Sequence, residues 1–111
     1  MNEYDIKFHS ARKTISDIDK EIAALFEKRM KAAEDVAEYK KLNGLPIEDL
    51  VREAQLIEAN SQLVSNDEIR SYYINFQKNI MRNQLDCLLK IQQYLFLWLI
   101  MLCLRKNMEI I

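Results

Sequence analysis

This chain of 111 residues contains almost no glycine or proline, with Gly44 and Pro46 as the single example of each. Because these residues mark turns and break helices, their scarcity predicts long helices joined by few connections. The sequence shows no strand-like alternation of apolar and polar residues and no internal repeat. We therefore expect an all-α fold, with one domain spanning residues 1–111.

Charge and cysteine content exclude further classes. A formal net charge of −1 removes the electrostatic case for a nucleic-acid partner or an anionic membrane surface. Cys87 and Cys103 do not form a disulfide scaffold, which favours a reducing cytoplasm. The first residues, Met-Asn-Glu-Tyr-Asp, have no basic region followed by an apolar core. We expect a cytoplasmic protein without a signal peptide.

Catalytic metal and nucleophile patterns are also missing. The single histidine, His9, lies near the start with no cluster of cysteine or carboxylate at ligand spacing. Cys87 has no histidine near it in sequence and is interpreted as a buried thiol. The sequence contains no glycine-rich phosphate loop, so we expect no metal and no nucleophilic mechanism.

Three helices are expected, in the order long, short, long. The first runs from about Asp5 to about Leu42 and ends at Asn43-Gly44. Asp49 is a plausible N-cap for a second helix, from about Leu50 to about Leu63. Ser65-Asn66-Asp67-Glu68 has the capping-box spacing and begins a third helix to about Leu104. Its apolar stripe is Ile69, Tyr73, Phe76, Ile80, Asn83, Cys87 and Tyr94.

The last part of the chain, residues 94–111, is an atypical apolar tail. Tyr94 to Leu104 reads YLFLWLIMLCL, eleven uncharged residues. A membrane-spanning helix needs about 20 such residues, so we expect no span. We interpret the run as a helix end buried on several sides in an oligomer. Membrane-surface attachment or a non-native tail are the alternatives.

An arginine interrupts the apolar seam of the first helix. The seam has alternating three- and four-residue spacing, which is typical of the core-facing side of an amphipathic helix. It consists of Ile15, Ile18, Ile22, Leu25, Arg29, Ala32 and Val36. Burial of part of an arginine costs on the order of several kcal/mol unless an anion pairs with the guanidinium. That anion could be the carboxylate of a neighbouring glutamate or a bound ligand.

Two further cations share this helix. Lys40 lies eleven residues after Arg29, which places it on the same face and ~16 Å along the axis. Arg12 lies seventeen residues before Arg29, ~25 Å away and a quarter turn or more around the helix. One straight helix cannot bring Arg12 and Arg29 to one small molecule. If Arg12 belongs to the site, it must come from a second copy of the chain.

Polar side chains also recur on the other two helices. Asp49, Arg52 and Glu53 share a face of the second helix at i, i+3 and i+4. Asn83 and Cys87 interrupt the apolar stripe of the third. Taken singly, these groups are explained by a helix cap, a surface ion pair and a register-setting polar residue. Together with the cations they favour a small dianion as ligand.

From about Arg12 to about Tyr94, the chain resembles the all-helical, type II chorismate mutases. The matching order is Arg12 before Ile-Ser-Asp-Ile-Asp, then Glu27-Lys-Arg29, Lys40, Pro46 and Asp49-Leu-Val-Arg52-Glu53. The resemblance implies two intertwined three-helix chains that convert chorismate to prephenate in phenylalanine and tyrosine biosynthesis, without metal or cofactor.

The resemblance also implies roles for individual residues. Arg29, Lys40, Arg52 and Glu53 would come from one chain and Arg12 from the other. Lys40, Arg29 and Glu53 would be catalytic, and Asp49 would contact the substrate. Asn83 stands where the family commonly has serine. Cys87 stands where it usually has glutamine or glutamate facing the ether oxygen, and a thiol is a weak donor.

Two other functions fit the same residues. An isochorismate-pyruvate lyase on this fold uses a similar set of cations, although Glu53 favours the mutase. A weakly active or degenerate mutase could act as a helical interaction module that regulates a partner enzyme, which Cys87 and the apolar tail would support.

Overall fold

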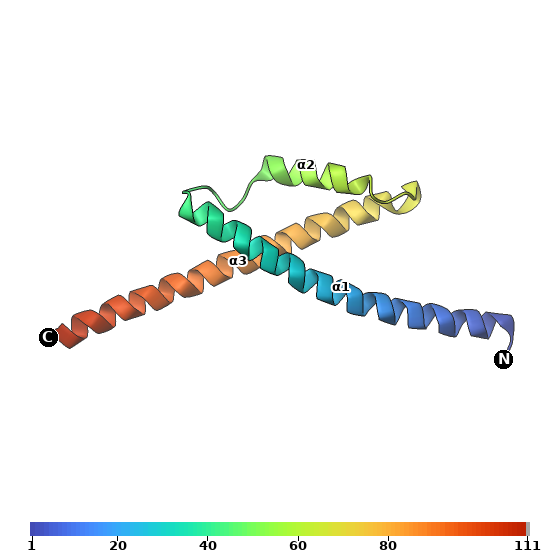
Figure 1. Ribbon diagram of the computed structural model, residues 1–111, viewed down its shortest axis with the longest axis horizontal. Helices are drawn as coiled ribbons and strands as arrows, with labels where there is room; N and C mark the ends of the chain where they lie inside the picture. Colours follow the sequence, from blue (N-terminus) through green and yellow to red (C-terminus); the bar gives the residue numbers. More distant parts are fainter. Residues whose placement is uncertain (111) are drawn as a thin grey trace. The chain divides into compact units, whose positions relative to one another are not determined.

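The computed structural model describes residues 1–110, with side chains described for residues 1–107. Its three helices are α1 (Glu3–Leu42), α2 (Leu50–Ser61) and α3 (Asp67–Ile110), shown in Figure 1. The expected all-α order of long, short and long helices is confirmed. α2 ends two residues before the expected bound, and α3 continues six residues beyond Leu104. Two compact units divide the chain, Met1–Val36 and Ala37–Ile111.

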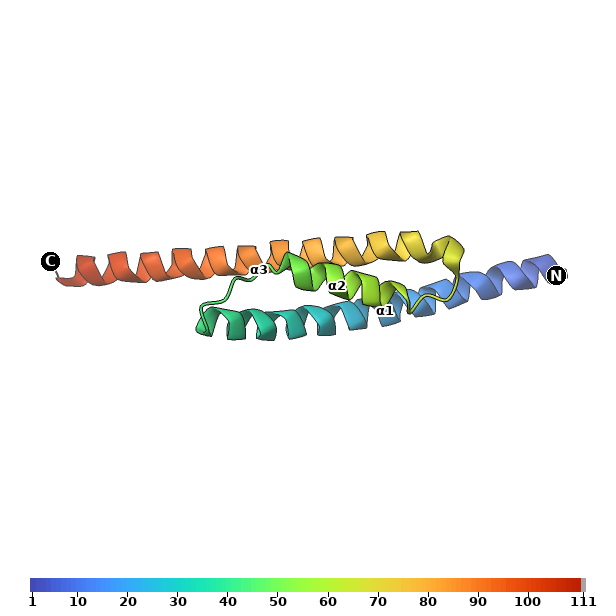
Figure 2. The ribbon, with the colours of Figure 1, turned by 90° about the horizontal axis from the view of Figure 1, so that it is seen from above.

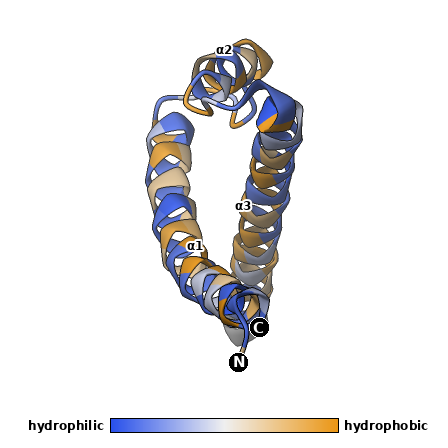
Figure 3. Ribbon diagram, turned by 90° about the vertical axis from the view of Figure 1, so that its right-hand side faces the viewer, coloured by the Kyte–Doolittle hydropathy of each residue, from blue (hydrophilic) through white to orange (hydrophobic). Residues whose placement is uncertain are grey.

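The first unit is a helix without a core of its own. None of the residues that the structure describes in α1 is buried. The apolar seam is exposed: Ile18 keeps 46% of its surface in solvent, Ile22 45% and Leu25 61%. In Figure 3, hydrophobic and hydrophilic stretches alternate along α1. Within this unit no second element packs on the seam, so its expected role as a core-facing surface stays a prediction.

Ion pairs between side chains one turn apart lie on the surface of this helix. Lys13 Nζ lies 2.9 Å from a carboxylate oxygen of Asp17. Lys31 Nζ lies 3.5 Å from Asp35 and 3.7 Å from Glu34. Attraction to the Asp35 carboxylate, followed by Glu34, raises the pKa of Lys31 above its ordinary value. Such solvated pairs add little to stability, so α1 depends on its seam for tertiary stabilisation.

The end of α1 follows the expected left-handed cap. Gly44 has φ +67°, a conformation that residues with a Cβ rarely adopt. The amide of Leu45 donates to the carbonyl of Lys40 at 2.8 Å, and that of Gly44 donates to Lys41 at 3.3 Å. These bonds satisfy carbonyls that the last turn leaves without helical partners.

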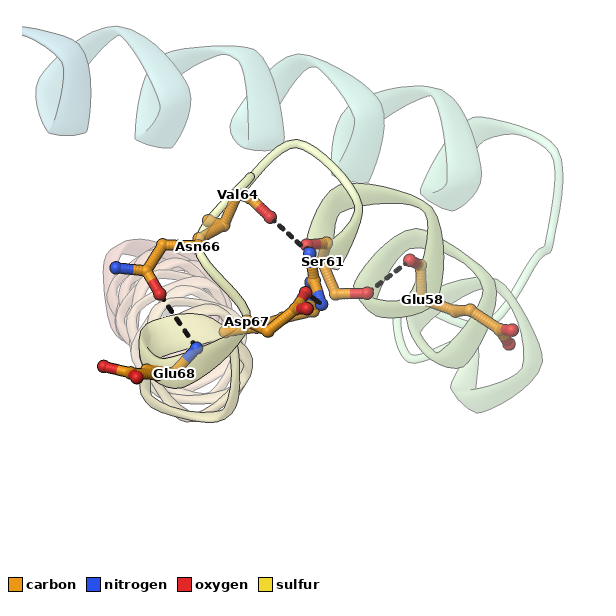
Figure 4. A network of polar contacts seen from close by, with 7 residues as sticks. Glu58, Ser61, Val64, Asn66, Asp67 and Glu68 are labelled. Carbon is orange, nitrogen blue, oxygen red and sulfur yellow. Dashed lines mark hydrogen bonds and ion pairs between the residues drawn. The ribbon is translucent and has the colours of Figure 1, made fainter.

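The caps of α2 and α3 confirm one prediction and correct another. Asp49 is the N-cap of α2, and its Oδ1 accepts from the amide of Arg52 at 3.0 Å. At α3 the side chain of Asn66, rather than that of Ser65, accepts from the amide of Glu68 at 2.9 Å (Figure 4). The carboxamide forms a two-residue local turn, which takes the role expected of the capping box.

A small polar core joins α2 to α3, which lie side by side in Figure 2. Its buried apolar residues are Met81 and Leu88. Buried Gln77 accepts from Asn60 Nδ2 at 3.1 Å and donates to the Tyr73 hydroxyl at 3.0 Å. A buried amide that loses such partners costs free energy, so this relay fixes the position of α2 along α3.

The connection between these helices is held by Arg70. Its Nε donates to the carbonyl of Ser61 at 3.1 Å and its Nη2 to that of Val64 at 2.8 Å. A second Nη pairs with Asp67. Ser61 is buried, and its hydroxyl donates to the carbonyl of Glu58 at 2.7 Å (Figure 4). One guanidinium thus fixes the turn between α2 and α3.

The face of α3 that packs on α2 differs from the expected stripe. Buried Gln77, Met81 and Leu88 lie about 100° around the helix from the expected stripe. On that stripe Ile69 and Phe76 remain exposed, at 52% and 45%. α3 therefore carries two apolar faces, of which α2 covers one. Periodicity alone does not reveal which face a short neighbour covers.

The final turns of α3 are apolar and exposed. The helical stretch Asp67–Asn107 is long and apolar enough to cross a membrane by length and composition, with mean hydropathy 1.8 and 6% of the window buried. The eleven-residue run from Tyr94 to Leu104 thus belongs to a longer stretch of low charge, in which Lys90 is the single charged residue between Cys87 and Leu104. The absence of a membrane span stays a prediction. Residues 94–107, the part of the tail whose side chains the structure describes, are exposed in the single chain, and their expected burial in an oligomer stays a prediction.

Candidate functional site

Lys40 is tied to the connection that leads into α2. It lies in the last turn of α1, is half-buried, and donates from Nζ to the carbonyl of Ile47 at 3.1 Å. A primary ammonium has two further donors, which this bond leaves available for a ligand. The contact places the cation two residues before Asp49, the start of α2. Within the second unit, Lys40 is therefore bonded to the connection that leads to the predicted site residues of α2.

The charged residues at the start of α2 differ in how far they are exposed to solvent. Asp49 is exposed and its carboxylate caps the helix. Arg52 is exposed, whereas Glu53 is half-buried. The sequence correctly predicted a cap at Asp49. The structure adds that Glu53, unlike Asp49 and Arg52, lines a cavity between α2 and α3.

A cavity of about 440 Å³ lies between α2 and α3 around Glu53. Its walls combine apolar residues with two carboxylates and two cations. The lining residues are Glu48, Leu50, Glu53, Ala54, Ile57, Lys78, Met81, Arg82 and Leu85. Lys78 and Arg82 were not identified from sequence, although their spacing of four residues places them on one helix face. They are the cations that the second unit places beside Glu53.

Asn83 and Cys87 do not line this cavity. Asn83 is two residues from Met81, which turns it about 200° around α3. It is exposed, and Cys87 is half-buried. In the single chain Asn83 lies on the side of α3 that α2 does not cover, so its expected place on a dry, inward face stays a prediction. Any ligand that Asn83 contacts must lie on the face of α3 that α2 does not cover.

The two arginines of the first unit have separate surroundings. Arg29 is half-buried, as its place in the seam predicts. Arg12 is exposed, and its guanidinium carbon lies 4.5 Å above the centre of the Phe8 ring, one turn earlier. This cation–π contact holds the guanidinium along the helix while leaving its edges in solvent. The geometry suits an arginine that can receive an anion.

In chemical terms, the predicted site residues offer cations and the half-buried carboxylate of Glu53. Fixed ammonium and guanidinium groups bind carboxylates, and guanidinium does so through two parallel hydrogen bonds. Glu53 can accept a hydrogen bond from a ligand hydroxyl. Such groups bind and orient a small dianion and stabilise negative charge that develops upon it.

Comparison with known proteins agrees with this chemistry. The family model for chorismate mutase type II matches residues 11–93, a segment that contains every predicted site residue. The bifunctional chorismate mutase/prephenate dehydratase of Buchnera aphidicola subsp. Schizaphis graminum is 38% identical over 65 residues. That alignment covers 59% of this chain and 17% of the Buchnera protein, so the chain corresponds to a small part of that relative. No solved structure matches the chain. The family match extends over most of the sequence, and the chain belongs to the chorismate mutase type II family.

Proposed function

We propose that this protein is an isomerase that rearranges chorismate to prephenate, in the biosynthesis of phenylalanine and tyrosine. One observation carries the proposal: the family match over residues 11–93 contains Arg12, Arg29, Lys40 and the Asp49-x-x-Arg52-Glu53 motif, the residues to which the resemblance assigns the site. The mutase named in the bifunctional relative supports the same reaction.

The proposed chemistry is binding and electrostatics. Chorismate carries two carboxylates, and the arginines would hold them so that the enolpyruvyl arm lies over the ring. As the C–O bond breaks and the new C–C bond forms within one molecule, negative charge builds on the ether oxygen. The Lys40 ammonium would stabilise that charge more than it stabilises the ground state. This rearrangement needs no nucleophile, metal or cofactor.

Two carboxylates complete the proposed site. Glu53, half-buried at the start of α2, would accept a hydrogen bond from the ring hydroxyl. Asp49 would contact the substrate at the same helix start, where its carboxylate already caps α2. The Lys40–Ile47 bond supports this arrangement, because it places the proposed catalytic ammonium next to the same turn.

We propose further that two chains form an intertwined homodimer and that Arg12 of each chain serves the other's site. The exposed seam of α1 and the uncovered stripe of α3 support a partner, since both are apolar surfaces left in solvent. Burial of apolar surface stabilises a complex by roughly 25 cal/mol for each Å², which favours pairing of such faces. The separation of Arg12 from Arg29 along one helix supports the exchange.

Mixing two inactive variants tests the exchange of Arg12. Arg12→Ala and Lys40→Ala are each expected to be inactive as pure dimers. In a symmetric heterodimer one site would regain both residues, so random mixing should restore about a quarter of wild-type activity. Co-refolding from denaturant followed by the chorismate assay measures this recovery. No recovery, with heterodimers demonstrated, would place Arg12 and Lys40 in one chain's site.

A second candidate function rests on Cys87. If the family position that faces the ether oxygen is held by a thiol, a hydrogen bond to that oxygen is weakened or lost. A weakly active mutase that regulates a partner enzyme would then be the better description. Calorimetry with a bicyclic transition-state analogue separates the two functions. Tight binding supports the enzyme, and failure to bind supports the interaction module.

The decisive experiment follows chorismate and isochorismate in parallel with the purified full chain. We expect chorismate to disappear with formation of prephenate, unaffected by a metal chelator. A pyruvate assay distinguishes the rearrangement from elimination. The rearrangement of chorismate releases no pyruvate, whereas the lyase on this fold would release pyruvate from isochorismate. Activity on isochorismate alone would reject the mutase assignment. We place this chemistry in the cytoplasm, in keeping with the two free cysteines.

A further inference from the structure

The last part of α3 is apolar on every side. From Tyr94 to Leu104 each residue is uncharged and nearly all are large, so no helix face is polar. The residues of this run are exposed, and Phe96 keeps 63% of its surface in solvent, Trp98 58% and Met101 69%. A helix that is hydrophobic all round is the type found inside a large protein or within a membrane.

This run lies beyond the segment that the family model matches. The family match ends at residue 93, immediately before Tyr94. The match already contains all predicted site residues. The apolar run therefore has a physical requirement for burial that the mutase fold itself does not explain.

Charged residues bound the run on both sides. The uncharged stretch extends from Ile91 to Leu104, with Lys90 before it and Arg105 and Lys106 after it. Its fourteen residues span about 21 Å as a helix. A helix shorter than the roughly 30 Å hydrocarbon core is accommodated by local thinning of the bilayer and by flanking cations that extend to the headgroups. The Lys90 ammonium can reach the headgroups in this way, because lysine extends along apolar surface.

A lipid bilayer fits these features better than a protein partner. One partner helix covers a single stripe and would leave the remaining faces in water. A helix lying flat in the interface would need a polar face, which this run lacks. Lipid chains cover all sides at once. Arg105 and Lys106 also complement anionic headgroups at the end of the run.

We propose that the segment Ile91–Leu104 of α3 inserts into a lipid bilayer and anchors the mutase domain to a membrane. The mean hydropathy of 1.8 for the membrane-length window in this helix supports insertion. Insertion is driven by the apolar side chains, with the flanking cations at the headgroups. It does not depend on which reaction residues 11–93 catalyse.

Trp98 provides a direct test, because it is the chain's single tryptophan and lies in the middle of the run. The full chain is synthesised in a cell-free system with vesicles of phosphatidylcholine and phosphatidylglycerol. We expect it to float with the vesicles after washing in high salt or alkaline carbonate. Trp98 emission should shift to shorter wavelength and be quenched by lipids brominated deep in their acyl chains. Pure phosphatidylcholine vesicles should also capture the chain.

Matched substitutions test whether the apolar run is responsible. Leu97→Arg places a charge inside the run and should lower partitioning into vesicles on the order of a hundredfold. Leu63→Arg makes the same change at a side chain that is 76% exposed in the α2–α3 connection, and should leave partitioning within about twofold. Circular dichroism confirms that both variants remain helical.

Three results would overturn the proposal. Release of the wild-type chain by high salt would mean attachment through charge alone. Soluble oligomers that ignore vesicles, with Trp98 already shielded, would mean that copies of the chain cover the run. Equal partitioning of helical Leu97→Arg and the wild-type chain would mean that this run does not enter the bilayer.

Discussion

Replacing Lys40 with alanine separates the proposed chemistry of this residue from its structural contact. In the structure its side chain makes one part-buried hydrogen bond, from Nζ to the Ile47 carbonyl at 3.1 Å. Loss of such a bond costs about 1 kcal/mol of stability. Removal of a cation that stabilises developing charge costs a factor of about 10²–10³ in rate, or roughly 3–4 kcal/mol. The two effects therefore differ enough to be measured separately.

We expect Lys40→Ala to lower kcat for chorismate by two orders of magnitude or more while the chain stays folded. Chorismate disappearance gives kcat and KM, and urea unfolding gives the free energy of unfolding. Lys41→Ala is the matched control, because it removes the same charge from the adjacent position, about 100° around α1. It should leave kcat within severalfold of wild type.

Near-normal turnover by Lys40→Ala would refute the reasoning, since the ammonium would then not act on the transition state. A large loss of stability with a proportionate loss of activity would also refute it. That result would make Lys40 a residue that holds the α1–α2 connection and nothing more.

Three further substitutions test other parts of the structure. Asp49→Ala should destabilise the chain by about 1 kcal/mol in urea unfolding, whereas Asp49→Asn keeps a capping oxygen and should be near neutral; equal losses would reject the cap. Cys87→Gln should raise kcat for chorismate by tenfold or more if it restores a donor to the ether oxygen, on the order expected for one such hydrogen bond; unchanged kcat would place Cys87 away from the substrate. Gln77→Leu should cost about 1–3 kcal/mol, because Asn60 and Tyr73 both lose a buried partner; thermal unfolding at wild-type temperature would show that water replaces it.

The helices and most of their ends were predictable from the sequence because their causes are local. Gly44 adopts positive φ where the first helix stops, and Asp49 caps the next. The exception is the start of α3. Ser65 has the capping-box spacing, yet Asn66 supplies the cap, since its shorter loop to Glu68 closes a turn within two residues. Competing caps one residue apart have similar local energies.

The polar core between α2 and α3 was not predicted. Buried Gln77 accepts a hydrogen bond from Asn60, which lies seventeen residues earlier in the chain. Arg70 binds carbonyls of the preceding turn. Polar residues such as these are ordinarily exposed, so composition favours the opposite prediction until their partners are known.

The sequence by itself determined three helices, their order, the caps at Gly44 and Asp49, and the family to which the chain belongs. Helix periodicity, turn residues and motif spacing depend on neighbours along the chain, and these are present in the sequence. Only the tertiary structure decided that α2 covers the Gln77–Met81–Leu88 face of α3 and leaves the Asn83 face open. It also decided that Lys40 binds the carbonyl of Ile47. Those outcomes depend on which segments meet in space, because burial of one apolar face competes with burial of another.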